Sequence, residues 1–357
     1  MHDDRVLCGL FKAETDTNLT LREQGKKLQV FKKSALKTIQ RNKNVTLILN
    51  HNQAQHIITL TKGENMNKIL LSCYLALTLI GLTACSTSQN NTAENTKAPP
   101  VSVQLWSVKD ALKKDFKGTL QQIADMGFQG VEFAGNFGEF SNNPEGLKEY
   151  LTSLGLKASG AHVGFDGLRG DKLEPTLNFL KVLGIDLVII PMDNRAWSAD
   201  GVASLATELT ELSSKLAKKG MLIGYHNHDK EFDAYQDATY WDYIAKNTPQ
   251  NVLLQLDVGW VNFADKDAVE YVKRYAGRTL TTHIKIRNYH GKNRTPQGAS
   301  PILGEDHYDW ATLIKTQATV GGTRWLVLEQ EEYPDGLSSM QAVKKSKQGL
   351  DKIIATL

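Results

Sequence analysis

The chain has 357 residues, 41% of them hydrophobic, which is enough for one sizeable core. Its formal charge of +3 is unevenly distributed, because residues 1–84 hold 12 basic and 6 acidic side chains. The other 273 residues hold 30 basic and 33 acidic side chains, which argues against a nucleic-acid-binding surface. Of Cys8, Cys73 and Cys85, only Cys85 belongs to this second part, so a disulfide framework and a thiolate metal site are both excluded there.

Residues 66–85 have the pattern of a bacterial lipoprotein signal peptide. Lys68 gives a positive start, and the apolar run from Ile69 to Leu82 is too short to span a bilayer comfortably. The run ends in Leu-Thr-Ala-Cys85, which resembles a lipobox, whose cysteine is lipidated. We therefore expect an exported protein, lipid-anchored through Cys85 and facing the periplasm or the cell surface. The alternative for this segment is a short buried helix.

The segments on either side fit this interpretation. Residues 86–100 are rich in Ser, Asn and Thr and end in two prolines, which predicts a flexible tether. Residues 1–65 are basic, rich in Asn, Lys and Gln, and without a clear fold pattern. Because a signal peptide belongs at the start of a protein, we expect residues 1–65 to be a mis-assigned upstream extension. Peptides from residues 10–60 of the native protein would contradict this expectation.

Residues 101–357 alternate between strand-like and helix-like segments. Apolar runs typical of strands recur about every thirty residues, and they begin near Val101, Gly130, Ala158, Leu187, Leu222, Val252, Leu280 and Trp325. Apolar residues at three- and four-residue spacing predict helices over 112–126, 147–154, 173–183, 202–217, 241–245, 269–275 and 310–316, and a last helix after residue 337. Helix-ending glycines are expected at Gly127, Gly155, Gly184 and Gly220.

This alternation predicts an α/β fold, a (β/α)8 TIM barrel over residues 101–357. The main competitor is an open doubly wound sheet, but no Gly-rich phosphate turn follows the first strand. The longest connection, around residues 288–304, is rich in Gly, Asn and Pro and reads as an extended loop.

Four successive predicted strands end in residues that can bind metals. Active sites of TIM barrels lie at the carboxyl ends of the strands, so these side chains should come together. Two histidines and two carboxylates suit a borderline divalent cation. The predicted metal ligands are His226, Asp257, His283 and Glu329.

Seven short segments resemble one known group of enzymes. VQLWSV, GVEF, GYHNHD, LDVGW, HIK, ILGEDHYDW and LVLEQEEY occur in this order and are similar to the sugar phosphate isomerase/epimerase group of the xylose isomerase-like TIM barrels. The resemblance covers residues 101–357 and implies a cofactor of one divalent metal ion (Mn, Zn, Co or Mg). It assigns the ligand positions of strands 6, 7 and 8 to Asp257, His283 and Glu329. In two places the chain departs from the pattern, because His226 stands where the epimerases usually have glutamate and Ile286 replaces an aspartate.

The chemistry shared by this group is removal of a proton from a carbon beside a carbonyl, which gives an enediolate-type intermediate. We expect Glu329 or Glu132 to act as the general base and Lys285 to hold a substrate oxygen. The expected substrate-binding residues, which bind hydroxyls, move protons or pack on a sugar ring, are His162, His228, Trp106 and Trp260.

Simpler explanations exist for these residues. Asp257 could be a turn former, and the histidines could be ordinary hydrogen-bonded side chains. Trp106 could belong to the core. Glu331 and Glu332 read as solvated loop charges, and His307 has no assigned role.

Three functions follow from these observations. The first is a metal-dependent isomerase or epimerase acting on a sugar or keto-sugar. The second is a lyase, such as a 3-keto-glycoside lyase/hydratase or a keto-sugar dehydratase, which the loss of one carboxylate at position 226 fits equally well. The third is a non-catalytic sugar-binding lipoprotein. In each case the partner is a small carbohydrate; a DNA-repair endonuclease shares the barrel type, but export and the acidic charge oppose that function.

Overall fold

A computed structural model describes residues 98–290, 295–296 and 300–357 together with the strand backbones between residues 10 and 61. The chain divides into two compact units, residues 1–91 and residues 92–357. The predicted signal peptide with Cys85, and the tether as far as residue 97, lie outside the described residues. Those predictions stay predictions, as does the origin of residues 1–65.

The first unit contains two small antiparallel sheets. One is formed by β1 (Leu10–Ala13), β2 (Asn18–Arg22) and β3 (Gln29–Lys32), and the other by β4 (Leu36–Arg41), β5 (Asn44–His51) and β6 (Ala54–Thr61). No pattern in the sequence predicted these strands.

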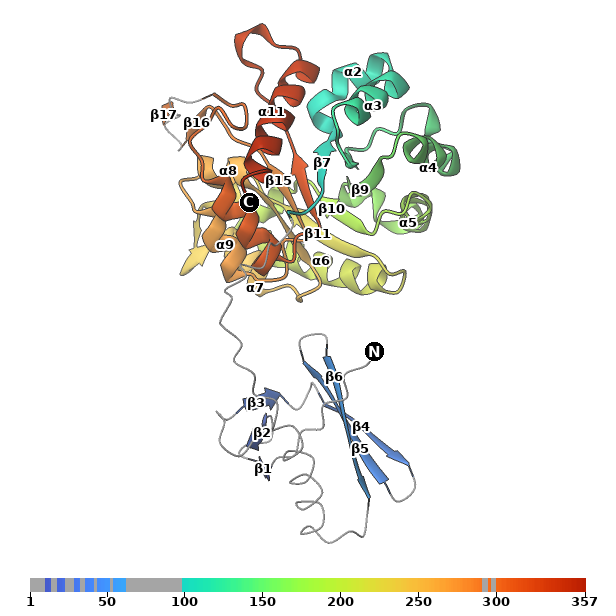
Figure 1. Cartoon of the computed structure of the whole chain (residues 1–357), viewed down its shortest axis with the longest axis vertical. Helices are drawn as coiled ribbons and strands as arrows, with labels where there is room; N and C mark the ends of the chain where they lie inside the picture. Colours follow the sequence, from blue (N-terminus) through green and yellow to red (C-terminus); the bar gives the residue numbers. More distant parts are fainter. Residues whose placement is uncertain are drawn as a thin grey trace, which may run out of the picture. The chain divides into compact units, whose positions relative to one another are not determined.

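The second unit is a closed barrel of eight parallel strands, as predicted (Figure 1). In chain order the strands are β7 (Val101–Gln104), β8 (Gly130–Phe133), β9 (Lys157–His162), β10 (Leu187–Ile190), β11 (Leu222–His226), β14 (Leu253–Asp257), β15 (Thr281–Ile284) and β18 (Trp325–Leu328). The first strand closes the barrel, because Leu326 of β18 pairs with Val101 and Ser102 pairs with Gly130 of β8.

The strands form where the sequence is almost continuously apolar. All four residues of β10, for example, are buried, because one face of each strand points into the barrel and the other is covered by helices. Polar residues also occur in the strands, and those on the inner face near the carboxyl ends form the site described below.

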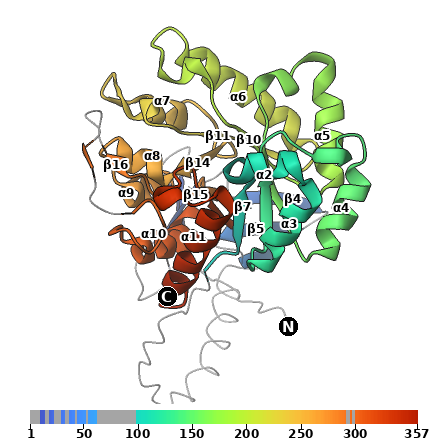
Figure 2. The ribbon, with the colours of Figure 1, turned by 90° about the horizontal axis from the view of Figure 1, so that it is seen from above.

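The helices surround the strands (Figure 2). They are α2 (Lys109–Lys114), α3 (Phe116–Asp125), α4 (Pro144–Ser153), α5 (Leu173–Val182), α6 (Val202–Ala217), α7 (Tyr240–Lys246), α8 (Val258–Phe263), α9 (Ala268–Arg274), α10 (Trp310–Thr316) and α11 (Ser339–Ile354). The four predicted helix-ending glycines all have positive φ angles, between 71° and 82°. No helix in the described part of the chain is long and apolar enough to cross a bilayer.

Two helix predictions need correction. The helix expected over 112–126 is two helices, because Asp115 has extended backbone angles (φ −153°, ψ 95°) and its side chain accepts a hydrogen bond from the Gly118 N–H at 2.8 Å. Asp115 therefore caps a new helix instead of continuing the old one. The short helix α8 was not expected at all, and it begins directly after Asp257.

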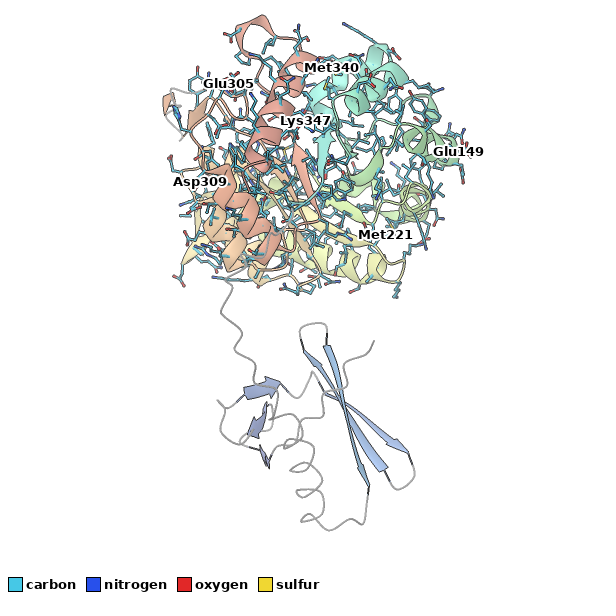
Figure 3. All side chains as sticks on the ribbon, viewed as in Figure 1. Glu149, Met221, Glu305, Asp309, Met340 and Lys347 are labelled. Atoms are coloured by element: carbon cyan, nitrogen blue, oxygen red, sulfur yellow. The ribbon has the colours of Figure 1, made fainter. Side chains whose placement is uncertain are left out.

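In the described part of the chain, two small hairpins lie in the connections between barrel strands. β12 (Ala234–Tyr235) pairs with β13 (Ala238–Thr239), and β16 (Tyr289–His290) pairs with β17 (Thr295–Pro296). The second hairpin lies within the connection that was predicted to be an extended loop. Figure 3 shows how densely side chains fill the barrel and its helical layer; Met221, labelled there, is buried directly before β11.

Candidate functional site

The four predicted ligands lie on neighbouring strands at one end of the barrel. His226 and Asp257 are the last residues of β11 and β14, His283 lies in β15, and Glu329 directly follows β18. These strands are consecutive neighbours in the closed sheet, and Asp257 pairs with His283 in register. The parallel order of the strands thus places four side chains, far apart in sequence, at one mouth.

The ligand atoms lie close together and are almost fully buried. Asp257 Oδ2 is 3.6 Å from His226 Nε2 and 3.8 Å from His283 Nδ1. Glu329 Oε2 is 3.1 Å from the same His283 nitrogen. One ligand atom each from Asp257, His283 and Glu329 lies within 4.8 Å of the other two. His226 joins this group through its contact with Asp257.

Asp257 is held in place by its neighbours on β11 and α8. Its backbone N–H donates to Asn227 Oδ1 at 2.9 Å, and its carbonyl accepts from Asn227 Nδ2 at 3.3 Å, so one side chain ties the ends of β11 and β14 together. Its Oδ1 accepts from the Trp260 N–H at 2.9 Å and so begins helix α8. Its Oδ2 is buried and accepts no hydrogen bond, which leaves that oxygen directed at the site.

Lys285 brings a positive charge to the same place. Its Nζ lies 2.8 Å from Asp257 Oδ2, 2.7 Å from Glu329 Oε2 and 2.7 Å from Glu331 Oε2. The contact with Asp257 lacks the alignment of a hydrogen bond, so we treat it as an ion pair. Burial opposes the charged form of Lys285, but the surrounding carboxylates outweigh it and raise the lysine pKa.

The two glutamates after Glu329 were predicted to be solvated loop charges, and this prediction is wrong. Both are half-buried and paired. Arg287 contacts Glu331 at 3.3 Å and Glu332 at 3.2 Å, and Glu332 also accepts a hydrogen bond from the Asn288 N–H at 3.0 Å. They form one wall of the mouth, with Arg287 stacked 3.8 Å from the centre of the Trp260 ring.

The pKa values of the ligands are displaced in opposite directions. Burial lowers the pKa of His226 well below its usual value, with the neighbouring His283 adding to the effect. Burial also disfavours charge on His283, but Glu329 and Glu132 outweigh it and raise the pKa of this ring to about 10. For Glu329, burial is outweighed by Lys285 and His283, which hold its pKa well below the usual range. At neutral pH, therefore, His226 is neutral, His283 is protonated, and Glu329 is ionised.

His228 lies at the edge of this group with an unused nitrogen. Its ring is 5.2 Å from that of His226 and 5.5 Å from that of Trp260, measured between centres. Its Nδ1 is buried without a hydrogen-bond partner. Burial, with a smaller effect of the Lys285 charge, lowers its pKa to about 4, so the ring is neutral at neutral pH. A neutral imidazole with an unused nitrogen is suited to contact a substrate hydroxyl.

The remaining predicted site residues divide between the interior and the rim. Glu132 and His162 lie inside the barrel, where Glu132 Oε1 is 2.6 Å from His283 Nε2 and 3.3 Å from His162 Nε2. Trp106 is 47% exposed after β7, so it is not a core residue. Tyr333, 38% exposed, lies near it and donates a hydrogen bond to the Ser107 carbonyl at 3.1 Å.

Gln255, which was not predicted as a site residue, contacts three of these residues. Its amide lies within hydrogen-bond distance of His162, His226 and Glu132. A signal was present, because Gln255 is a polar residue inside an apolar strand and shares a face with Asp257 two residues later. The same reasoning applies to Gln104, which donates to Glu132 Oε1 at 2.8 Å.

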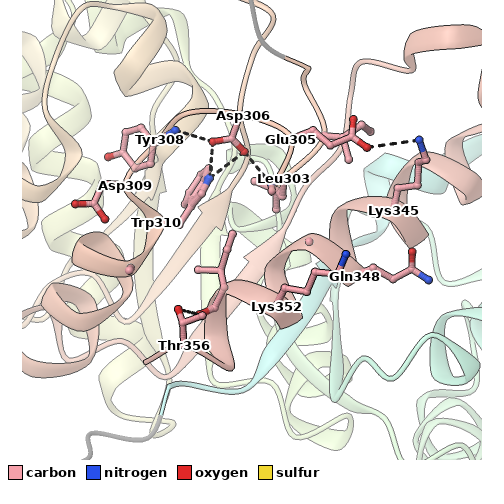
Figure 4. Close-up of a pocket in the computed structure, with 15 residues that line it drawn as sticks. Leu303, Glu305, Asp306, Tyr308, Asp309, Trp310, Lys345, Gln348, Lys352 and Thr356 are labelled. Carbon is pink, nitrogen blue, oxygen red and sulfur yellow. Dashed lines mark hydrogen bonds and ion pairs between the residues drawn. The ribbon is translucent and has the colours of Figure 1, made fainter.

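A separate pocket of about 500 Å³ lies between residues 302–311 and helix α11 (Figure 4). No predicted site residue lines it. Two of its acidic groups have partners: Glu305 Oε1 is 3.5 Å from Lys345 Nζ, and Asp306 accepts from the Trp310 ring N–H at 2.9 Å.

The residues at the mouth fit a divalent cation. Nitrogen and oxygen ligands at about 2.0–2.3 Å from one ion lie some 3–4.5 Å from each other, and the separations here fall in that range. Asp257 Oδ2 is buried and has no hydrogen bond, and it forms an ion pair with Lys285. Lys285 Nζ contacts the same oxygens, so it would have to move aside for an ion to bind.

Residues 120–355 match the family model described as the xylose isomerase-like TIM barrel, and the chain belongs to this family. The chain is 22% identical to the rhizopine catabolism protein MocC of Rhizobium meliloti over 271 residues, which is 66% of this chain and 81% of that protein. It is 26% identical to an inosose dehydratase of Clostridium botulinum over 156 residues, 40% of this chain and 52% of that protein. Against the 3-dehydroshikimate dehydratase of Pseudomonas aeruginosa it is 27% identical over 150 residues, 39% of this chain and only 23% of that protein.

Solved structures have the same fold. A sugar phosphate isomerase/epimerase from Parabacteroides distasonis matches with a TM-score of 0.59 and 22% identity, covering 71% of this chain and 98% of that one. The IOLI protein with a bound zinc atom matches with a TM-score of 0.53 and 15% identity, over 72% of this chain and 98% of that one. A xylose isomerase-like TIM barrel protein from Mycobacterium smegmatis in complex with magnesium matches with a TM-score of 0.51 and 13% identity, covering 72% of this chain and 97% of that one. At these identities the similarity concerns the fold.

Proposed function

We propose that this barrel is a divalent-metal-dependent lyase that removes water from a keto-sugar or a cyclic keto-polyol. The observation that carries the proposal is the meeting of Asp257, His283 and Glu329 at one mouth, with His226 and the unused nitrogen of His228 beside them. Two nitrogen and two oxygen ligands suit Mn, Zn, Co or Mg to different degrees, so the donor set alone leaves the metal open.

The chain's own groups can carry out the proton transfers. A bound divalent ion would supply a Lewis acid that stabilises negative charge on the substrate oxygens. Glu329, ionised at neutral pH, takes the proton from the carbon beside the carbonyl. The bond from the next carbon to its hydroxyl then breaks, and the proton held by Glu329 passes to this hydroxyl, which leaves as water while hydrogen-bonded to His228. Lys285 holds a substrate oxygen once it has moved away from the carboxylates.

Two observations favour elimination over isomerisation. A two-base epimerase needs a second carboxylate opposite Glu329, and position 226 carries a histidine whose Nδ1 is 2.9 Å from Gln255 Oε1. In addition, several relatives bear the names of dehydratases. If the proton returned to the neighbouring carbon, the same residues would instead give an isomer, as the structural neighbours named isomerase/epimerase suggest.

The experiment has two parts. Metal content is measured by plasma mass spectrometry on the purified protein and on the Asp257→Ala, Glu329→Ala double variant, with Glu305→Ala as an exposed control. About one equivalent of metal in the protein and the control, and none in the double variant, is expected. The metal-loaded protein is then incubated with keto-inositols and 3-keto-glycosides, and the masses of the products are measured by mass spectrometry.

A product lighter by one water supports the lyase, and an isomer of equal mass supports the isomerase. Binding without conversion of any tested sugar, in a protein that holds no metal, contradicts both and favours a sugar-binding protein.

We further propose that the protein is exported and lipid-anchored through Cys85. The support is the lipobox-like Leu-Thr-Ala-Cys motif after a short apolar run. Expression with a labelled fatty acid should label the protein but not its Cys85→Ser variant. Label in the variant, or none in either, contradicts the proposal.

A further inference from the structure

Gln255 connects the candidate metal site with a second, deeper layer of polar residues. It lies two residues before Asp257 on β14, on the same inner face, and it is fully buried. Its Oε1 is 2.7 Å from His162 Nε2 and 2.9 Å from His226 Nδ1. Its Nε2 donates to Glu132 Oε2 at 2.8 Å and lies 3.3 Å from Thr281 Oγ1. Both ends of the amide are therefore occupied.

The orientation of this amide is determined by Glu132. A carboxylate only accepts hydrogen bonds, so the NH₂ end of Gln255 must face it. The oxygen end then faces the two histidines, and an amide oxygen also only accepts. Both ring nitrogens in contact with it must therefore carry a hydrogen. For His226 this places the proton on Nδ1 and leaves the lone pair on Nε2, the nitrogen 3.6 Å from Asp257 Oδ2.

Glu132 acts on His283 directly. Its Oε1 accepts from Gln104 Nε2 at 2.8 Å and from His283 Nε2 at 2.6 Å. A hydrogen fixed on the Nε2 of His283 directs the other nitrogen, Nδ1, towards Glu329, 3.1 Å away. One fully buried carboxylate thus orients both histidines, one through a direct bond and the other through Gln255.

We propose that Glu132 and Gln255 are positioning residues. Gln255 selects the ring tautomer of His226, and Glu132 keeps a hydrogen on Nε2 of His283, so that Nε2 of His226 and, once its proton has left, Nδ1 of His283 can bind the ion. The proposal rests on the metal-dependent function proposed above, but the tautomer of His226 can be tested without metal. In this arrangement Glu132 does not serve as the general base, because both of its oxygens are occupied inside the barrel.

The same cluster has a competing interpretation. Nitrogens of His162, His226 and His283 lie within 4.8 Å of one another and could hold a second ion. However, one nitrogen of each ring already contacts Gln255 or Glu132, and these hydrogen bonds account for the clustering of the three rings without an ion. The two interpretations predict different stoichiometries, one ion or two.

The first measurement is ¹⁵N NMR of the histidine rings in the metal-free protein, with His226 assigned by its loss in His226→Gln. The proposal expects a protonated Nδ1 and an unprotonated Nε2 for His226. The opposite tautomer overturns it. The tautomer is read in the unaltered chain without metal, and the variant serves only to assign the signal, so the result does not depend on whether the proposed function is correct.

The second measurement is Co²⁺ binding, followed by its visible absorption spectrum and by titration, in the protein and in Gln255→Met and Glu132→Gln. Outer residues that orient ligands typically change metal affinity by about 10–100-fold, and we expect a weakening of this size with an altered spectrum. The matched control is Gln317→Met, since Gln317 is equally buried but donates only to Thr282, at 3.0 Å.

The outcomes separate the two proposals. One equivalent of Co²⁺, weakened in Gln255→Met and Glu132→Gln but not in the control, supports the positioning role. Equal affinity and an unchanged spectrum in all variants overturn it and leave the proposed function standing. Two equivalents overturn it in favour of the three-histidine site. No binding by the unaltered protein contradicts the proposed function and removes the metal-directed part of this inference, whereas the NMR result still decides the tautomer.

Discussion

The ammonium nitrogen of Lys285 lies 2.7 Å from Glu329 Oε2, inside the group of side chains expected to hold a divalent ion. It also contacts Asp257 and Glu331, so a single positive charge reduces the repulsion among three carboxylates. The metal-free site is thereby stabilised, and a divalent ion must displace the lysine to bind.

Lys285→Met should therefore destabilise the metal-free protein and strengthen its response to metal. Removing one partner of a buried ion pair typically costs about 3–5 kcal/mol of unfolding free energy, because the other charge stays buried. Urea unfolding measures this loss, and added Zn²⁺ or Mn²⁺ should raise Tm more in the variant than in the unaltered protein. Lys347→Met is the control, since Lys347 is also buried but pairs with the half-exposed Asp351 of its own helix (Lys347 is labelled in Figure 3). An equal metal-induced shift in all three proteins would count against the displacement.

Asn227→Ala should weaken both stability and metal binding. The change removes the two hydrogen bonds that join Asn227 to the backbone of Asp257 and leaves a buried N–H without a partner. We expect a loss of about 1–3 kcal/mol in unfolding free energy. Metal titration should show weaker binding, because Asp257 loses its support. Asn143→Ala, which removes the cap of helix α4, should lower stability but leave metal affinity unchanged. Similar metal affinity in both variants would contradict the role of Asn227.

Stability should fall as the pH rises through 7, because of Glu231. This carboxyl is fully buried, and burial raises its pKa from 4.5 to about 7. Because the pKa is higher in the folded than in the unfolded state, the protonated Glu231 adds to the free energy of unfolding. This stabilisation is complete below about pH 4.5 and is lost as the pH rises through about 7. The loss is at most about 3 kcal/mol, at roughly 1.4 kcal/mol per pKa unit.

Glu231→Gln cannot ionise, so its unfolding free energy should change less between pH 5 and pH 8 than that of the unaltered protein. Urea unfolding at several pH values makes the comparison. The exposed Glu211→Gln serves as the control. Parallel curves for all three proteins would show that Glu231 is not the titrating group.

Gly349→Ala should be strongly destabilising. Helix α11 crosses the loop after β15 so closely that a Cβ at position 349 would lie 1.7 Å from the Leu303 carbonyl oxygen. Relief requires backbone movement, and we expect a loss of about 3 kcal/mol or more. Gly164→Ala, where a Cβ meets no atom within 4 Å, should have little effect. Thermal unfolding of both variants provides the measurement, and equal Tm values would refute the predicted clash.

The barrel could be predicted because its signals are local and repeated. Most strands begin in an apolar run, and the glycines at 127, 155, 184 and 220 each follow the end of a helix with a positive φ angle. The break at Asp115 escaped prediction because the apolar periodicity continues across it, while the backbone follows the cap made by one side chain. Helix α8 escaped because it is only six residues long and has no periodicity to detect.

The site was predictable at the level of strand ends but not of contacts. The order of the strands in a closed barrel is enough to bring His226, Asp257, His283 and Glu329 to one mouth. The contact of Gln255 with Glu132, 123 positions apart, depends on how side chains meet across the interior. Likewise, that Lys285 contacts three carboxylates depends on the path of the chain after β15 and β18. Sequence spacing holds no information about either.

The pairing of β7 with both β18 and β8 determines where the chain enters the barrel. Since all eight strands are parallel, the chain before Val101 enters at the amino end of the barrel, and the candidate metal ligands lie at the opposite end. A lipid on Cys85 would be joined to the amino end of the barrel by a tether of fifteen residues, which reaches about 50 Å when fully extended. The candidate metal ligands would then lie at the end of the barrel away from the tether.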